Sequence, residues 1–267
     1  MRNCAWLVVV LTSCRVGFAH HFFNEPISWN KDGQSPPCKN CADPEPRPAA
    51  VDEKLWKVMV QIDAQGAKIS DLKADFVQKK FTPLLKKPLV SSGTILIKGP
   101  ASLWKTVQPS QTVMRIDAKE ARLLYPEQKV LEVYAVDQQL GSLAASPFPR
   151  LEVIKRHFTF ERIAVKELSP DADETAHVAL RMRPIEPELR KHVDQVCVLL
   201  EISSGLVLRA QTIDADGDRT VMTFSNIRTN TGLKDRDLEM EVPPGVKITH
   251  PLEGVGGAPP ASREKGK

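Results

Sequence analysis

The sequence predicts an α+β fold that is mostly β: a strongly curved antiparallel sheet forming a half-closed β-barrel, with helices covering its concave apolar face. Three observations predict this fold. An amphipathic helix opens the folded part of the chain, runs with a period of two follow it, and turn residues separate these runs at hairpin spacing. A single sheet of this size must bury one face, and a curved sheet does so by wrapping around its covering helices.

The opening helix begins just after residue 50. Asp52 is a candidate N-cap, and Leu55, Met59 and Ile62 recur on one face at helical spacing. Gly66 is expected to end the helix.

Five segments in the first half of the folded region predict strands, because apolar residues alternate with polar ones or form short β-branched runs. These strands are expected at residues 72–77, 94–98, 103–107, 113–116 and 121–124. Gly99 and Pro100 end the second strand, and residues 117–120 supply the turn before the fifth.

The second half predicts four more strands, which the short turns arrange as an antiparallel meander. They are expected at residues 178–182, 195–202, 206–213 and 219–224. The region from 137 to 156 is less regular, with a short helix at 151–156. The D-A-D-G-D segment at 214–218 is interpreted as a hairpin turn, because an EF-hand would need Gly and Glu where Arg219 and Ser225 stand.

Residues 1–19 have the pattern of an export signal: Arg2 precedes an apolar run that is too short to span a bilayer. Two alternative processing sites fit this signal. Gly17 and Ala19 suit ordinary cleavage, whereas L-T-S-C at residues 11–14 resembles a bacterial lipobox that would leave Cys14 acylated. Either route takes the mature protein out of the cytoplasm, and the second anchors it to a membrane through Cys14.

Residues 20–50 form a predicted linker because they hold six prolines and show no hydrophobic period. Residues 252–267 are a predicted disordered tail, which leaves 51–251 as one domain. Cys38 and Cys41 form a C-x-x-C pair within the linker, where an oxidised local loop is favoured over redox or metal chemistry. Cys197 lies in an apolar strand and is expected to be a core residue.

Composition and motifs disfavour several classes of function. The net charge is +4 and the pI about 8.7, too weakly basic to indicate a nucleic-acid partner. The sequence contains no nucleophile elbow, P-loop, H-E-x-x-H or dinucleotide-binding motif, so no catalytic residue, metal site or cofactor is predicted. A secreted hydrolase whose active site is assembled from distant residues stays as the remote alternative.

Several short motifs occur in a characteristic order along the folded region. They are F-V-Q at 76–78, G-T-I-L-I-K-G-P at 93–100, Q-P at 108–109, D-A-K at 117–119, L-R-M-R-P at 180–184, F-S-N-I at 224–227 and P-P-G-V at 243–246. Together they resemble the family of LolA, the periplasmic carrier of outer-membrane lipoproteins. The resemblance covers about residues 51–250. Gly99 departs from it, since the family often has there a basic residue that is associated with handing cargo onward.

The resemblance implies a monomeric, non-enzymatic periplasmic carrier that holds lipoprotein acyl chains, or another lipid, in an apolar cavity. It also implies an inner-membrane lipoprotein-releasing transporter that loads the carrier and an outer-membrane acceptor that unloads it. If Cys14 is acylated, the same fold would instead serve as an anchored acceptor or as an envelope-stress sensor.

Apolar strand positions in the first half are the candidate lipid-binding residues. They are Phe76, Ile95, Ile97, Leu103, Val107, Met114 and Ile116. Each either lines a cavity or fills an ordinary core. By alternation Leu103 and Val107 share a face, while Trp104 lies at the cavity rim or packs on the outer face, the second being preferred. Leu103→Glu is therefore expected to keep the fold and lose acyl binding.

Overall fold

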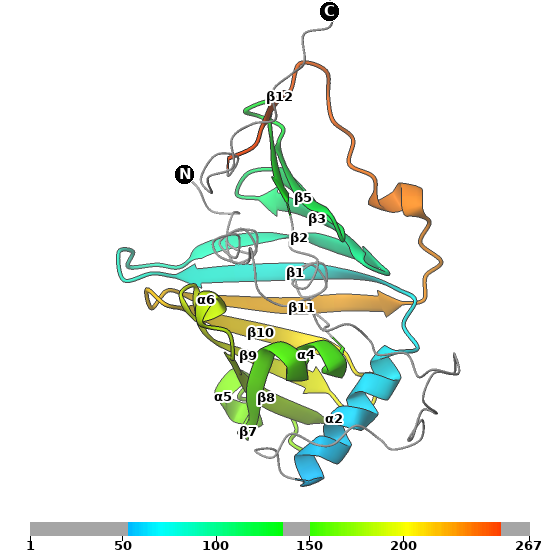
Figure 1. Cartoon of the computed structure of the whole chain (residues 1–267), viewed down its shortest axis with the longest axis vertical. Coiled ribbons are helices and arrows are strands. Elements are labelled where there is room, and N and C mark those ends of the chain that lie inside the picture. Colours follow the sequence, from blue (N-terminus) through cyan, green and yellow to red (C-terminus); the bar gives the residue numbers. More distant parts are fainter. Residues whose placement is uncertain (1–52, 136–149, 252–267) are drawn as a thin grey trace, which may run out of the picture.

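The computed structural model describes residues 53–135 and 150–251 (Figure 1). The predicted export signal, linker and tail lie outside these residues, as do Cys14, Cys38 and Cys41.

The described residues form one twelve-stranded sheet that is strongly curved and does not close, as predicted (Figure 1). The strands are β1 (Asp71–Phe81), β2 (Leu89–Lys98), β3 (Ala101–Gln108), β4 (Thr112–Ile116), β5 (Glu120–Tyr125), β6 (Val130–Ala135), β7 (Phe158–Ile163), β8 (His177–Pro184), β9 (Val193–Glu201), β10 (Val207–Asp214), β11 (Arg219–Thr229) and β12 (Lys247–Thr249). The helices are α2 (Glu53–Gly66), α4 (Leu151–His157), α5 (Val165–Leu168), α6 (Pro187–Arg190) and the 3-10 helix η2 (Asp235–Leu238).

Two antiparallel meanders make up the sheet. One runs from β1 to β6 and the other from β7 to β11, each strand pairing with the next. Antiparallel pairing of β1 with β11 joins the two meanders at the centre. β12 then adds to the far edge as a parallel partner of β6.

The predicted elements are present, and several are longer than the local pattern indicated. The buried face of α2 consists of Leu55, Met59 and Ile62, as expected from their spacing. The short helix expected at 151–156 is α4. β6, β7 and β12, the short helices α5 and α6, and η2 were not predicted from the pattern.

Helices α2, α4 and α6 lie against one face of the sheet, which we call the inner face (Figure 1). Their apolar residues and those of the strands form one continuous cluster, which includes Met59, Ile154 and Leu189 from the helices. The opposite, outer face carries a smaller cluster beneath α5, and the buried Cys197 belongs to it, as predicted for a core residue. The strands beneath α5, among them β8 and β9, thus alternate between two packed faces.

The chain after β11 crosses the outer face before it reaches β12. Within it, η2 contacts β2 and β3, and Lys98 Nζ forms an ion pair with Asp235 at 2.8 Å. Arg115 Nε donates a hydrogen bond of 3.1 Å to the Leu238 carbonyl. We call residues 230–246 the C-terminal strap.

Within the described part of the chain, none of the helices has both the length and the apolar character needed to cross a membrane.

Candidate functional site

The inner face carries an extended apolar cluster to which both helices and strands contribute. Strand register places its residues: Ile95 on β2 lies opposite Trp104 on β3, which lies opposite Met114 on β4. On the other side of β2, Phe76 on β1 lies opposite Phe224 on β11. Directly opposed residues of an antiparallel pair project to the same side, so these side chains from five strands share one surface.

Five of the seven candidate residues lie on this inner face. Phe76, Ile95 and Ile97 belong to the buried inner cluster, and Met114 packs against it. Ile116 is fully buried and lies opposite Ser102, which is in turn the register partner of Ile97.

The structure does not bring Leu103 and Val107 together with the other five. Leu103 lies on the outer face, because its neighbour Trp104 points inward. Leu103 is fully buried, and its partner on β4, Arg115, holds the C-terminal strap. Val107 lies at the register shift between β2 and β3 and has no register partner on β2 or β4, so alternation from Leu103 does not assign its face. Its side chain is 56% exposed and does not belong to the inner cluster.

The preferred outer-face position of Trp104 was wrong. Its ring lies in the inner cluster, 5.3 Å from Phe76 and 6.4 Å from Phe224 between centroids, at interplanar angles of 64° and 57°. The indole Nε1 donates a hydrogen bond to Ser102 Oγ at 3.2 Å, so its polar atom is satisfied although the residue is buried. Three aromatic rings from β3, β1 and β11 therefore form the middle of the inner face.

Glycine is required at position 93 where β2 passes β3. A Cβ on Gly93 would lie 1.9 Å from the Lys105 carbonyl oxygen, well inside any permitted contact. Gly93 is the register partner of Phe76, and the ladder between β2 and β3 shifts register beside it. The close backbone approach thus occurs next to the aromatic cluster.

Part of the inner face remains accessible. Met114, Met222, Ala210 and Val196 are only partly buried although all pack against the inner cluster. With the buried Met59 and Met182, four of the six methionines in the sequence lie in or against this cluster. Methionine is flexible and polarisable, so a surface rich in it adapts to apolar ligands of irregular shape.

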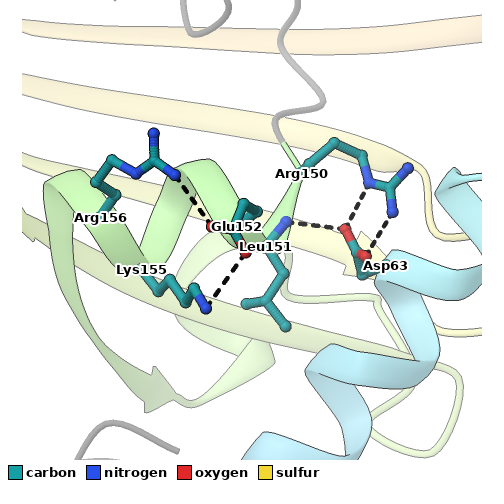
Figure 2. A network of polar contacts seen from close by, with 6 residues as sticks. All are labelled: Asp63, Arg150, Leu151, Glu152, Lys155 and Arg156. Carbon is teal, nitrogen blue, oxygen red and sulfur yellow. Dashed lines mark hydrogen bonds and ion pairs between the residues drawn. The ribbon is translucent and has the colours of Figure 1, made fainter. Parts of the chain in front are cut away.

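A polar network fixes the end of α2 to the start of α4 (Figure 2). Asp63 on α2 accepts hydrogen bonds from Arg150 Nε at 2.8 Å and Nη2 at 2.7 Å, and from the Leu151 backbone N–H at 2.8 Å. The hydrogen bond from Arg150 is the main cause that lowers the pKa of Asp63; burial opposes it, and the Leu151 N–H adds to it. The carboxylate also caps the first turn of α4, where negative charge is favourable.

Several polar groups that sequence analysis singled out have structural contacts. Burial raises the pKa of the Cys197 thiol, although the nearby Arg181 opposes this, so the thiol is a poor nucleophile. His157 is buried, and its Nδ1 lies 2.8 Å from Glu186 Oε1. Asp214 and Asp218 close the β10–β11 hairpin turn, as predicted for this segment. No cluster of three or more potential metal ligands occurs among residues 53–135 and 150–251.

Comparison with known proteins identifies the family. The model of the outer membrane lipoprotein carrier protein LolA matches residues 67–238. Outer-membrane lipoprotein carrier proteins from Dechloromonas aromatica and Bordetella avium are 25% and 23% identical over 184 and 190 residues. These alignments cover 66% and 70% of this chain and 80% and 85% of the relatives. A solved LolA superfamily protein from Nitrosomonas europaea matches with 10% identity and a TM-score of 0.40, over 69% of this chain and 97% of that one. The family match spans well over half of the sequence, and the chain therefore belongs to the family of the outer membrane lipoprotein carrier protein LolA.

Proposed function

We propose that the protein is a non-enzymatic carrier that binds the acyl chains of lipoproteins against its inner face and transports them between the inner and outer membranes. The observation that carries the proposal is the extended apolar inner face, which is rich in methionine and still accessible at Met114 and Met222. The carrier names of the relatives support it.

The energetics explain why such a carrier needs this surface. Each CH₂ group removed from water contributes about 0.8 kcal/mol, so one long acyl chain exposed to water costs on the order of 10 kcal/mol. A carrier must cover that chain and later release it. An aliphatic surface with adaptable methionines suits this better than a tightly interlocked core, because its contacts rearrange at low cost.

Acyl binding is tested by titrating the full-length protein with a fluorescent fatty acid. Met114→Glu and Met222→Glu place a charge on the accessible inner face, and each should weaken binding at least tenfold. Val107→Glu is the matched control, because Val107 is a 56% exposed strand residue outside the inner cluster and its substitution should leave affinity unchanged. Equal affinity in all three variants, or an equal loss in Val107→Glu, would contradict inner-face binding.

Transport requires a second experiment. Inner-membrane vesicles that contain a lipoprotein-releasing transporter should release acylated lipoprotein into a soluble complex with the protein. Outer membranes that contain an acceptor should then take that lipoprotein up. The intact mass of the exported protein separates the carrier from its alternative, since an acylated Cys14 would indicate an anchored acceptor or an envelope-stress sensor of the same fold.

A further inference from the structure

The hairpin between β1 and β2 exposes two leucines at its tip. Leu84 is 90% exposed and Leu85 is 46% exposed. Both lie in a four-residue turn that begins at Thr82, has Pro83 at its second position and is closed by a 3.1 Å hydrogen bond from the Leu85 N–H to the Thr82 carbonyl. Single exposed leucines are common on protein surfaces, but adjacent ones at the tip of a projecting hairpin are not explained by folding.

The base of the hairpin contacts the neighbouring β10–β11 turn through two side-chain interactions. Lys80 Nζ forms an ion pair with Asp218 at 2.8 Å, and the guanidinium of Arg219 lies 4.0 Å from the centre of the Phe81 ring. The leucines therefore lie on a hairpin whose base is attached to the neighbouring turn; Figure 1 shows this hairpin at the end of β1 and β2.

More apolar side chains are exposed next to the tip. Among the described residues, nine large apolar side chains are markedly exposed, and five of them come from β1, β2, β3 and the hairpin. These five are Val77, Leu84, Leu85, Val90 and Val107. Val90 is the register partner of Lys79, two positions along β1 from Val77, so their side chains are diagonal neighbours on one face.

The charge of the hairpin has one sign. Residues 76–93 contain four lysines and no acidic residue. Lys79, Lys86 and Lys87 are exposed, the last two directly following the leucines. Lys80, at the base of the hairpin, is paired with Asp218 of the acidic β10–β11 turn, whereas Lys86 and Lys87 lie at the tip. Exposed leucines followed directly by exposed lysines match the boundary between lipid headgroups and acyl chains in an anionic bilayer.

We propose that the β1–β2 hairpin docks the protein on anionic membranes, with Leu84 and Leu85 inserted among the acyl chains and the flanking lysines on the headgroups. This inference goes beyond the proposed function, because docking needs no bound cargo. A protein that does not bind the fluorescent fatty acid could still bind membranes through the hairpin, and a protein that does not bind membranes could still bind the fatty acid. The two proposals can therefore fail separately.

The test is co-sedimentation of the full-length protein with vesicles of phosphatidylethanolamine and phosphatidylglycerol, and with vesicles of phosphatidylcholine alone. Every sample carries Cys14→Ser, so that no acyl chain on Cys14 contributes to membrane binding. All variants then begin at the same N-terminal residue. Leu84→Gln/Leu85→Gln should weaken partitioning onto the anionic vesicles by roughly tenfold or more. Lys86→Gln/Lys87→Gln should weaken it roughly tenfold on anionic vesicles and leave the phosphatidylcholine result unchanged.

The matched control is Val60→Gln/Val242→Gln, which removes two exposed apolar side chains, 46% and 42% exposed, away from the hairpin. It should bind as the parent does. The proposal is overturned if the leucine variant, with an unchanged unfolding midpoint, binds like the parent, or if the control loses as much. A different pair of results also overturns it: the parent does not bind protein-free anionic vesicles, and the hairpin cross-links to a membrane protein. The partner would then be a protein and not the lipid surface.

Discussion

At the scale of single residues, the direction in which each strand side chain points decides its role. Trp104 and Leu103 are neighbours in sequence, yet Trp104 packs among the inner-face aromatic rings and Leu103 lies buried on the outer face. A substitution at each position should therefore change a different property of the protein.

Leu103→Ala should lower the free energy of unfolding by about 2–5 kcal/mol, because it leaves a cavity at a fully buried position. It should leave the fatty-acid affinity unchanged. Val107→Ala, on the same strand but exposed, should change stability by less than about 0.5 kcal/mol. Urea unfolding and the fluorescent titration measure both effects. If Leu103→Ala instead lost fatty-acid affinity without a change in stability, Leu103 would be a lipid-binding residue after all.

The residue that sequence reasoning misplaced could have been placed correctly. Gly99 and Pro100 form a two-residue turn, and Lys98 pairs with Ala101 across it. Counting outward from that turn sets Ile97 opposite Ser102 and Ile95 opposite Trp104. Alternation within one strand does not show which of its faces is the inner one. The register across a tight turn does show which residues of two neighbouring strands share a face, so a residue placed on one strand places its partner on the next.

At the scale of elements, α2 is attached to the rest of the molecule by contacts that strand patterns do not reveal. Its period predicted the buried face well, since that face depends on local spacing alone. Its ion pair with Arg150 joins residues 87 positions apart. β6 and β7 were missed because each is short and lies beside the irregular middle region, where the alternation is brief.

The Asp63–Arg150 contact predicts an acid-sensitive attachment of α2. The pKa of Asp63 is lowered from 3.8 in the folded protein, so its contribution to stability is present above that value and is lost as pH falls through the folded pKa. Asp63→Asn should cost about 1 kcal/mol at neutral pH, since the pair is partly solvated. It should also flatten the loss of stability below about pH 4.

Glu152→Gln provides the control for this prediction. Glu152 pairs with Arg156 at 3.1 Å on the exposed side of α4, so its neutralisation should cost less than about 0.5 kcal/mol (Figure 2). Unfolding midpoints measured between pH 3 and 7 distinguish the two variants. Parallel pH profiles for the parent and Asp63→Asn would show that Asp63 does not cause the acid sensitivity.

The β9–β10 turn approaches α2 closely at Gly205. Its φ is +74°, and a Cβ there would lie 2.6 Å from the Ile62 carbonyl oxygen and 2.9 Å from the Gly66 nitrogen. Gly205→Ala should therefore displace the end of α2 and destabilise the protein by about 1–3 kcal/mol. Gly217→Ala shares the positive φ but meets nothing within 4 Å, so the difference between the two midpoints isolates the contact with α2.

At the scale of the whole molecule, one pairing turns two meanders into a single sheet. Short turns predict which neighbouring strands pair, so each meander could be anticipated from the sequence. The β1–β11 pairing aligns Phe76 with Phe224, 148 positions along the chain, and no local spacing indicates that register. The overall fold could be predicted because the order of the motifs resembles that of the LolA family. The accessible part of the inner face could not be predicted, because it depends on how the strands and helices pack in three dimensions.

The Asp71 carboxylate is one of the groups that attach the C-terminal strap where it leaves the sheet, beside the hydrogen bonds of Asn230 with Ser70 and Lys68. Asp71 at the start of β1 accepts hydrogen bonds from the Thr231 N–H and hydroxyl, both at 2.7 Å, and from the Gly232 N–H at 3.0 Å. Burial alone would raise the pKa of Asp71, but these hydrogen bonds outweigh it and lower the pKa. The carboxylate therefore stabilises the fold above its unfolded pKa of 3.8 and ceases to do so as pH falls through its lower folded value.

Asp71→Asn should release the start of the strap, because an amide has one acceptor oxygen in place of two and its NH₂ group would face N–H donors. The melting temperature at pH 7 should fall by roughly 2–4 °C or more. The difference from the parent should shrink as the pH is lowered below about 4, since the parent then loses the same charge. Hydrogen exchange should increase first at the amides of Thr231 and Gly232, whereas the amides that join β1 to β2 stay protected. Exchange that rises equally in both places would mean that Asp71 stabilises the whole sheet and not the start of the strap in particular.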